Sequence, residues 1–204
     1  MIQRPPGPAP RMFPAASHVA ARIAEALREE GLGVALLNAD GWLNLPHVRF
    51  SPTRPAEYFY RHALRFEEMF SKLVLPLARH REVRVTADFA EETAETFRRH
   101  HHAYRDVDVV LLEGIYLLQP AFLRHYDLKI WIECSFETAL ERAIARRQEA
   151  LSVDRTVAAY RTIYFPAQRI HFAHDGPREA ADLILLNDRR LEGLGLERRH
   201  VALY

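Results

Sequence analysis

The chain has 204 residues, a formal net charge of +1 and 49% hydrophobic residues, enough apolar material for one compact domain with its own core. A net charge this close to zero gives no argument for binding to nucleic acid or to a membrane surface. The single cysteine, Cys134, excludes a disulfide scaffold and fits a reducing cytoplasm, and no apolar run reaches the length of a membrane span.

The first regular elements are predicted soon after the amino terminus. Val19, Ile23 and Leu27 recur at helical spacing, so we expect a helix over residues 17–30 that ends at the following glycine. A short buried strand over 34–38 comes directly after it. A helix, a tight turn and a strand in this order are typical of the second half of a nucleotide-binding βαβ unit.

The rest of the chain is predicted to alternate helices with strands. In chain order we expect a proline-punctuated loop (40–60), a long helix (56–72), a strand (82–89), a polar helix (91–105), a strand (107–114), a short helix, a strand (127–135), two helices (136–151 and 153–172) and a strand (181–188). Strands that are apolar on both faces and alternate with helices indicate a parallel sheet covered on both sides. Functional side chains are then expected at the carboxyl edge of the sheet.

Two acidic residues stand at such strand ends. Asp40 follows the strand over 34–38, and Glu113 ends the apolar segment VDVVLLE. A carboxylate just past a buried strand is costly to desolvate unless it serves a cation, a metal-bound water or a hydroxyl. The alternative interpretation is helix capping or a surface turn, which is ordinary for an aspartate before glycine. Two acids at one sheet edge suit magnesium-assisted phosphoryl transfer, one as base and the other holding the water shell of the ion.

Four segments together resemble the uridine kinase/phosphoribulokinase family of P-loop kinases: LNADGW, DVDVVLLEGIYLL, DLKIWIECSFETALERAIARRQE and YRTIYFPAQRIHFAHDGPREAADLILLND. The similarity runs in unbroken order from Val19 to Asp188. It implies an α/β P-loop NTPase fold, with a parallel sheet of about five strands flanked by helices and a helical lid at about 142–165. It also implies Mg²⁺-dependent transfer of the γ-phosphate of ATP to a hydroxyl of a nucleoside such as uridine or cytidine.

The resemblance implies a role for each of five residues. Asp40 matches the acid that accepts the proton of the substrate hydroxyl, and Glu113 matches the acid beside magnesium. Arg142 and Arg146 match the lid arginines that contact the phosphates of ATP, and Arg169 lies where the family has polar groups on the substrate side. Apart from the family, Arg142 and Arg146 lie four residues apart on one helix face. A pair at this spacing could bind a triphosphate together or form a salt-bridged solvent face.

The first 16 residues do not match the family pattern G-x-x-x-x-G-K-[ST]. Aligning the pattern places Ser17 on the hydroxyl that would bind magnesium, with Ala16 on the lysine and Ala15 on the glycine before it. Prolines remove backbone donors from the loop that should hold phosphate, and MIQRPPGPAP cannot form a central strand. A well-patterned body beside an incompatible start suggests an altered amino terminus. We therefore expect an irregular amino terminus with a doubtful first strand and no phosphate loop (1–16), a kinase domain (17–190) and a polar tail (191–204).

Three interpretations of the function stay open. The first is an ATP-dependent nucleoside kinase, and the second is a non-catalytic binding or regulatory relative that keeps the pocket. The third is a kinase for a vitamin precursor or a sugar, for which the unmatched loop 42–60 leaves room. A small-molecule partner is expected, with no nucleic acid or membrane, and a homo-oligomer stays open. The run His100–His102 is predicted to be a solvated helix face, because three successive helical positions point in three directions and cannot meet one metal.

Overall fold

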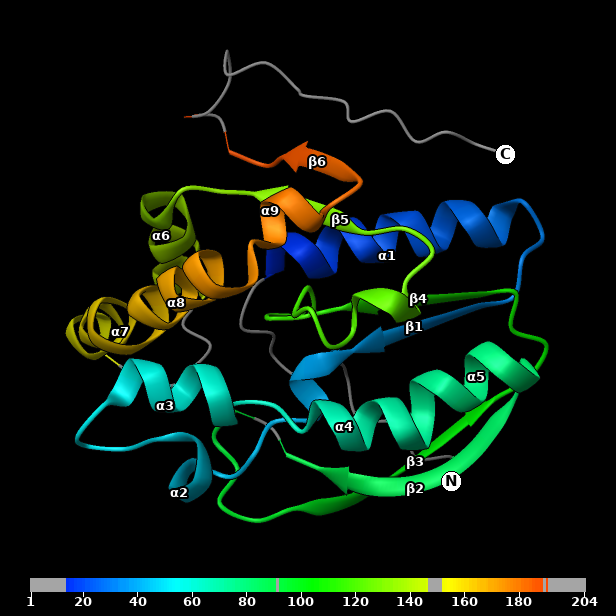
Figure 1. The fold of residues 1–204 in the computed structure, drawn as a ribbon, viewed down its shortest axis with the longest axis horizontal. Helices are drawn as coiled ribbons and strands as arrows, with labels where there is room; N and C mark the ends of the chain where they lie inside the picture. The colour runs from blue at the N-terminus through cyan, green and yellow to red at the C-terminus, as the bar shows by residue number, and fades with distance from the viewer. Residues whose placement is uncertain (1–13, 91, 147–151, 189, 191–204) are drawn as a thin grey trace, which may run out of the picture.

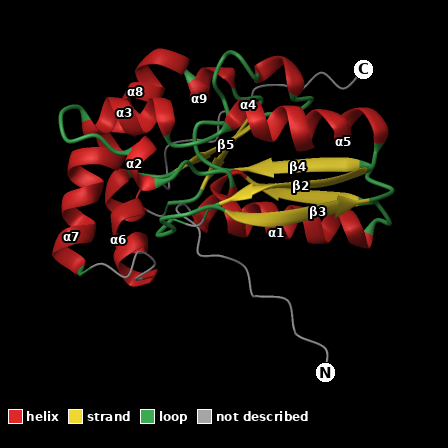
Figure 2. Ribbon diagram, turned by 90° about the horizontal axis from the view of Figure 1, so that it is seen from below, coloured by secondary structure: helices red, strands yellow, loops and turns green. Residues whose placement is uncertain are grey.

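The computed structural model describes residues 14–90, 92–146, 152–188 and 190 of the chain. Parallel strands lie at the centre, with α1 on one face and α4 and α5 on the other (Figures 1 and 2). This is the expected α/β arrangement. Among the described residues, no helix is long and apolar enough to cross a membrane.

The parallel strands form two pairs. β1 (Val34–Asn38) pairs with β4 (Val109–Glu113), and β5 (Ile130–Glu133) pairs with β6 (Leu183–Leu186). Their apolar sequences predict all four strands, and their pairing confirms a parallel sheet. The doubtful first strand falls on residues before Pro14, which lie outside the described part, as does the expected polar tail.

An antiparallel hairpin stands where the sequence predicts a strand and a polar helix. β2 (Val83–Phe89) pairs with β3 (Arg98–Tyr104), so the strand expected at 82–89 is present, but it is not part of the parallel sheet. The helix expected over 91–105 is wrong.

Residues 98–104 form a strand and not a helix because β2 is available to pair with them. Val83 and Val85 pack against the core from one face of β2, and their register partners Tyr104 and His102 extend that face. A run rich in arginine and histidine has only a weak helical preference, and pairing with a neighbouring strand overrides it. The three histidines therefore alternate between two faces of a strand, and no group of three or more metal-ligating side chains is found in the described part of the chain.

The helices start where proline is tolerated. Four of the described helices begin with a proline, at a position where its missing N–H costs nothing. The bounds are α1 (Pro14–Glu29), α2 (Pro46–Arg49), α3 (Pro55–His62), α4 (Phe66–Met69), α5 (Leu75–His80), α6 (Phe136–Arg146), α7 (Val153–Ala159), α8 (Phe165–Asp175) and α9 (Pro177–Ala180).

The long helix expected over 56–72 is interrupted at residues 63–65. The carbonyl of Ala63 accepts a hydrogen bond from the amide of Asn44 (2.8 Å), and Leu64 forms an isolated bridge with Leu43. The chain therefore leaves the helix to pair with the segment after β1, and it re-enters a helix at α4. This pairing between distant segments has no local sequence signal.

Two π-helical turns let the later helices pass a proline. The turn Phe70–Val74 joins α4 to α5 ahead of Pro76, and the turn Tyr160–Tyr164 joins α7 to α8 ahead of Pro166. Proline offers no N–H and crowds the preceding turn, so a widened turn allows the helical run to continue. The helix expected over 153–172 is confirmed as such a continuous run.

Candidate active site

The candidate site lies at the carboxyl ends of β1 and β4. The two strands end level with each other, because Asn38 and Glu113 are register partners. A 3₁₀ turn over Ala39–Gly41 follows β1, and the side chain of Asn38 accepts a hydrogen bond from the amide of Asp40 at 2.7 Å. Asp40 is thus held in a half-buried turn at this edge. The strand ends therefore place both predicted acids at one edge of the sheet.

Glycine is required directly after Glu113. Gly114 has φ of 153°, and a Cβ at this position would lie 2.5 Å from the Cβ of Ala39. Any side chain here would collide with the turn that carries Asp40. The close approach of the two backbones therefore sets the spacing between the two acids.

Ser17 reaches the same edge from the first turns of α1. Its hydroxyl lies 2.9 Å from Oε1 and 2.8 Å from Oε2 of Glu113, and donates to this carboxylate. Both residues are buried, at 3% and 6% exposure. A carboxylate near the amino end of a 16-residue helix is also stabilised by the helix dipole. The structure thus brings together the two residues that the family pattern aligns with magnesium binding.

Oxygen ligands of this kind fit Mg²⁺, which is held in proteins by a carboxylate or hydroxyl together with several waters. The described residues are less suited to binding the phosphates of ATP. Ala16 stands where the pattern has lysine, and the residues before Pro14 lie outside the described part. The described residues therefore fit the ion better than they fit the triphosphate.

The β2–β3 hairpin forms a wall beside the turn that carries Asp40. A Cβ at Gly41 would lie 2.6 Å from the ring of Phe89, so the glycine lets this ring pack on the turn. The next residue, Trp42, stacks on His102 with the ring centroids 5.7 Å apart. Burial and the nearby His100 and His101 lower the pKa of His102 to about 4, so this ring is neutral at pH 7. Sequence reasoning missed this wall because it predicts a helix here.

A second group that sequence reasoning missed surrounds Asp175. Its carboxylate accepts from the hydroxyl of Tyr60 (2.5 Å) and contacts Nδ1 of His171 (2.6 Å) and of His174 (2.7 Å). Burial alone would raise the pKa of Asp175, but these hydrogen bonds outweigh it and hold the pKa below its usual value. The spacing of His171 and Asp175 on one helix face was the available signal.

This group adjoins the candidate site through Tyr116, three residues after Glu113. The ring of Tyr116 lies 5.4 Å from that of Tyr60 and 5.2 Å from that of His171. Tyr116 is buried and has φ of 57°, a conformation that a bulky residue adopts only when its surroundings enforce it. The segment after Glu113 is therefore held against α3 and α8.

The predicted arginines lie near the other pair of strands. Arg142 donates to the carbonyl of Asn187 at 2.8 Å, and its guanidinium lies 3.7 Å from the sulfur of Cys134. Arg169 stacks over the ring of Phe136 at 4.7 Å. Arg146 is the last residue of α6, and its side chain lies outside the described part, like residues 147–151 of the expected lid. In the described residues, Arg142 and Arg169 serve packing contacts around β5 and β6.

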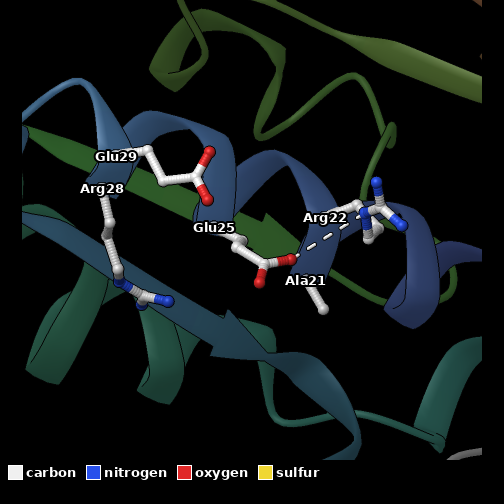
Figure 3. A pocket seen from close by; sticks show the side chains of 5 residues that line it. All are labelled: Ala21, Arg22, Glu25, Arg28 and Glu29. Carbon is white, nitrogen blue, oxygen red and sulfur yellow. Dashed lines mark ion pairs between the residues drawn. The ribbon is translucent and has the colours of Figure 1, made fainter.

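A shallow depression on α1 is unrelated to these residues. It is lined by Ala21, Arg22, Glu25, Arg28 and Glu29, all from α1 itself (Figure 3). Arg22 and Glu25 form an ion pair of 3.9 Å between well-exposed side chains, as expected for a solvated helix face. This depression is open surface and not a binding cleft.

No protein-family model matches the chain, and no curated protein matches its sequence. Solved structures do share its fold. A possible uridine kinase from Bacillus stearothermophilus has a TM-score of 0.65 and 17% identity, covering 87% of this chain and 84% of its own. A candidate fructose transport system kinase from Silicibacter sp. TM1040 has a TM-score of 0.59 and 20% identity, with coverages of 83% and 87%. The phosphoribulokinase of Rhodobacter spheroides has a TM-score of 0.59 and 15% identity, with coverages of 84% and 66%.

All three are P-loop kinases of the uridine kinase/phosphoribulokinase group. The chain therefore has the fold of a P-loop kinase, as its sequence predicts.

Proposed function

We propose that the chain is built for ATP-dependent phosphorylation of a small hydroxylated molecule, with a nucleoside such as uridine as the first candidate. The observation that carries the proposal is the buried contact between Ser17 and Glu113, level with the turn that holds Asp40. A hydroxyl and a carboxylate at the end of a parallel strand, next to a second acid, suit magnesium-assisted phosphoryl transfer.

Each residue has a distinct task in this proposal. Ser17 and Glu113 hold the ion or its waters, and the bound Mg-ATP supplies the phosphoryl group and the metal charge. Asp40 accepts the proton that the acceptor hydroxyl loses when it is phosphorylated. Arg142 and Arg146 close over the phosphates, for which Arg142 must leave the carbonyl of Asn187. The free thiol of Cys134 is in keeping with a cytoplasmic setting.

A non-catalytic binding protein is the second candidate, and a specific observation favours it. The residues before Ser17 include alanine where the lysine should stand and prolines where amides should hold the phosphates. A chain without these groups keeps an acceptor site but loses most of its hold on ATP. The third candidate, a kinase for a sugar or a vitamin precursor, is supported by two structural neighbours whose names point to sugar-related substrates.

The first experiment is a calorimetric titration of the chain with Mg-ATP. We expect no binding tighter than the millimolar range, because the loop amides and the lysine that hold the β- and γ-phosphates are missing. A variant with a G-x-x-x-x-G-K loop directly before Ser17, preceded by an apolar strand, should regain affinity. A micromolar dissociation constant for the unaltered chain would show that phosphate binding does not need this loop.

The loop-restored variant then separates the three candidates. ADP formation is measured with uridine, a sugar and a vitamin precursor as acceptors. Turnover with uridine supports the nucleoside kinase, and turnover with another acceptor supports the third candidate. Tight ATP binding without turnover on any acceptor would favour the binding protein.

A further inference from the structure

The three histidines of β3 have no task in the proposed function, and their arrangement differs from the one that the sequence predicts. Because residues 98–104 form a strand, His100 and His102 lie on one face and His101 lies on the other. Residues two apart in a strand are separated by about 7 Å, which two imidazole side chains can span. In a helix the same two side chains would point in nearly opposite directions. The strand therefore makes a pair of His100 and His102.

The two rings of this pair lie close together. Their centroids are 4.5 Å apart and their planes cross at 68°. Metal–nitrogen bonds of about 2.0–2.1 Å place two imidazole rings that share one ion with their centroids about 4.5–5 Å apart. The rings of His100 and His102 are thus at the spacing of two ligands of one ion, and rotation of the rings alone can direct a nitrogen of each toward it.

Aromatic neighbours position both rings and leave their nitrogens free. Trp42 stacks on His102 with an interplanar angle of 13°, and the ring of Phe89 lies 5.2 Å from that of His100. The nitrogens of a histidine lie in the plane of its ring, so a stacked neighbour does not occupy them. Within the described part of the chain, the ring nitrogens of His100 and His102 make no hydrogen bond, whereas Nδ1 of His101 lies 3.1 Å from a threonine hydroxyl.

The nitrogens of the pair are also accessible at neutral pH. His100 is exposed and His102 is half-buried. Burial and the neighbouring histidines lower the pKa of His102 to about 4, so its ring is neutral at pH 7 and offers a lone pair to an ion. The histidines of α8 differ in this respect, because Nδ1 of His171 and of His174 both contact Asp175, at 2.6 and 2.7 Å.

We propose that His100 and His102 form a two-histidine site for a divalent late transition-metal ion such as Zn²⁺ or Cu²⁺. Imidazole nitrogen suits these ions, whereas Mg²⁺ and Ca²⁺ prefer oxygen ligands. No third histidine, cysteine or carboxylate of the described residues completes the site, so water takes the remaining positions. The site is separate from the contact between Ser17 and Glu113, and the proposal does not depend on the proposed kinase activity.

Calorimetric titration of the full chain with Cu²⁺, on protein that carries no histidine tag, measures the affinity of the pair. The strand holds the second imidazole at a high effective concentration, so His100→Ala should weaken the tightest binding by about tenfold or more. His101→Ala is the matched control, because its ring lies on the opposite face, and it should leave the affinity unchanged. Equal affinities for the unaltered chain and His100→Ala would overturn the proposal.

A second variant separates the loss of a ligand from a loss of structure. His102→Phe keeps a ring against Trp42 but has no nitrogen, so it should weaken the binding of Cu²⁺ as His100→Ala does. The electron paramagnetic resonance spectrum of the Cu²⁺ complex should show two nitrogen ligands for the unaltered chain and one for either variant. A single nitrogen ligand in the unaltered chain would overturn the proposal.

Thermal unfolding with Zn²⁺ tests whether the site belongs to the folded strand. An ion that binds only the folded chain raises its melting temperature, so saturating Zn²⁺ should raise that of the unaltered chain and of His101→Ala by a few degrees. The melting temperatures of His100→Ala and His102→Phe should not respond. The chain has 11 histidines in all, and an equal response of all four proteins would assign the ion to others among them and overturn the proposal.

Discussion

The carboxyl ends of the two strand pairs are built in different ways. At the end of β1 and β4, the oxygens of Glu113 meet the hydroxyl of Ser17 from another element, and Asp40 lies in the adjoining turn. At the end of β5 and β6, the polar groups are occupied with one another. Asp188 accepts from the amide of Ser135 at 2.9 Å and from its hydroxyl at 2.5 Å, and its neighbour in the chain accepts from an arginine of α6.

The hydrogen bonds at the end of β5 and β6 also shift the pKa of Asp188. Burial would raise the pKa of this carboxyl, but hydrogen bonds from Ser135, Thr138 and the amide of Arg190 outweigh burial and hold it far below its usual value. A carboxylate that accepts this many hydrogen bonds fixes the loop between β5 and α6 and has a structural role. Asp188 therefore fixes the segments at the end of the second pair, whereas Asp40 and Glu113 stand at the end of the first pair, where the proposed chemistry is placed.

The largest expected effect comes from Asp40. In the loop-restored protein, Asp40→Asn should lower turnover by about 100-fold or more, since a positioned base contributes about that much to a proton transfer. Its affinity for Mg-ATP should stay nearly unchanged, because a base acts in the transfer step. The measurement is kcat beside a calorimetric titration, with Asp127→Asn at an exposed position as control. Retained turnover in Asp40→Asn would place the reaction elsewhere.

The next prediction concerns the arginines of α6, the helix that follows the second strand pair. Arg146→Ala in the loop-restored protein should lower turnover by about 100-fold, as expected for the loss of one charge that stabilises a transition state. Its melting temperature should stay within a few degrees, because a surface ion pair contributes only about 0–1 kcal/mol. Melting and turnover are measured on one preparation. Unchanged turnover would assign Arg146 to a solvated helix face.

Arg142 is assigned to the phosphates as well, and it allows a comparison of stability with Arg146. It lies on the same helix face but donates to the carbonyl of Asn187, so Arg142→Ala leaves a half-buried acceptor without its donor. Such a loss costs about 1–3 kcal/mol. We therefore expect Arg142→Ala to lower the melting temperature more than Arg146→Ala does.

The sequence predicted the parts of the molecule that depend on local patterns. The apolar runs give the four parallel strands, and the acids at their ends are where the strands place them. The break at Ala63 and the hairpin strand β3 could not be predicted in this way. Both depend on a partner segment elsewhere in the chain: the segment after β1 in one case and the preceding strand β2 in the other. A strongly polar run such as RRHHHAY carries no apolar period that would identify it as a strand.

The same distinction applies to the contacts at the site. The contact between Ser17 and Glu113 joins residues 96 positions apart, and only the family pattern relates them. The hydrogen bond between Tyr60 and Asp175 spans 115 positions, and no motif announces it. The place of a strand end is a local property, whereas the partners of its side chains are set by the packing of the whole chain.

The hydrogen bonds around Asp175 are expected to contribute to the stability of the whole fold. Asp175→Ala removes the carboxylate that accepts from the half-buried Tyr60 and that contacts the buried ring of His171. Leaving two such groups without this acceptor costs about 1–3 kcal/mol each, which corresponds to a melting temperature lower by about 4 °C or more. Thermal unfolding checks this, with Asp127→Ala at an exposed position as control. Equal melting temperatures for the two variants would contradict the role assigned to this carboxylate.

The smallest expected effect concerns the wall that the hairpin adds beside Asp40. The pKa of His102 is about 4 in the folded chain, against an ordinary value of 6.5, because burial and the neighbouring histidines oppose its charge. A group with a lowered folded pKa binds fewer protons in the folded state than in the unfolded state over this interval. Its contribution to stability is therefore complete above pH 6.5 and is lost as the pH falls toward 4. The melting temperature of the unaltered chain should fall by a few degrees over this interval on account of His102.

Two variants test this assignment. His102→Phe keeps a ring against Trp42 but carries no proton, so its melting temperature should depend less on pH. His102→Gln should show the same reduced dependence on pH at a lower overall stability. Parallel curves for all three proteins would show that the proton on His102 has no part in the stability of the hairpin.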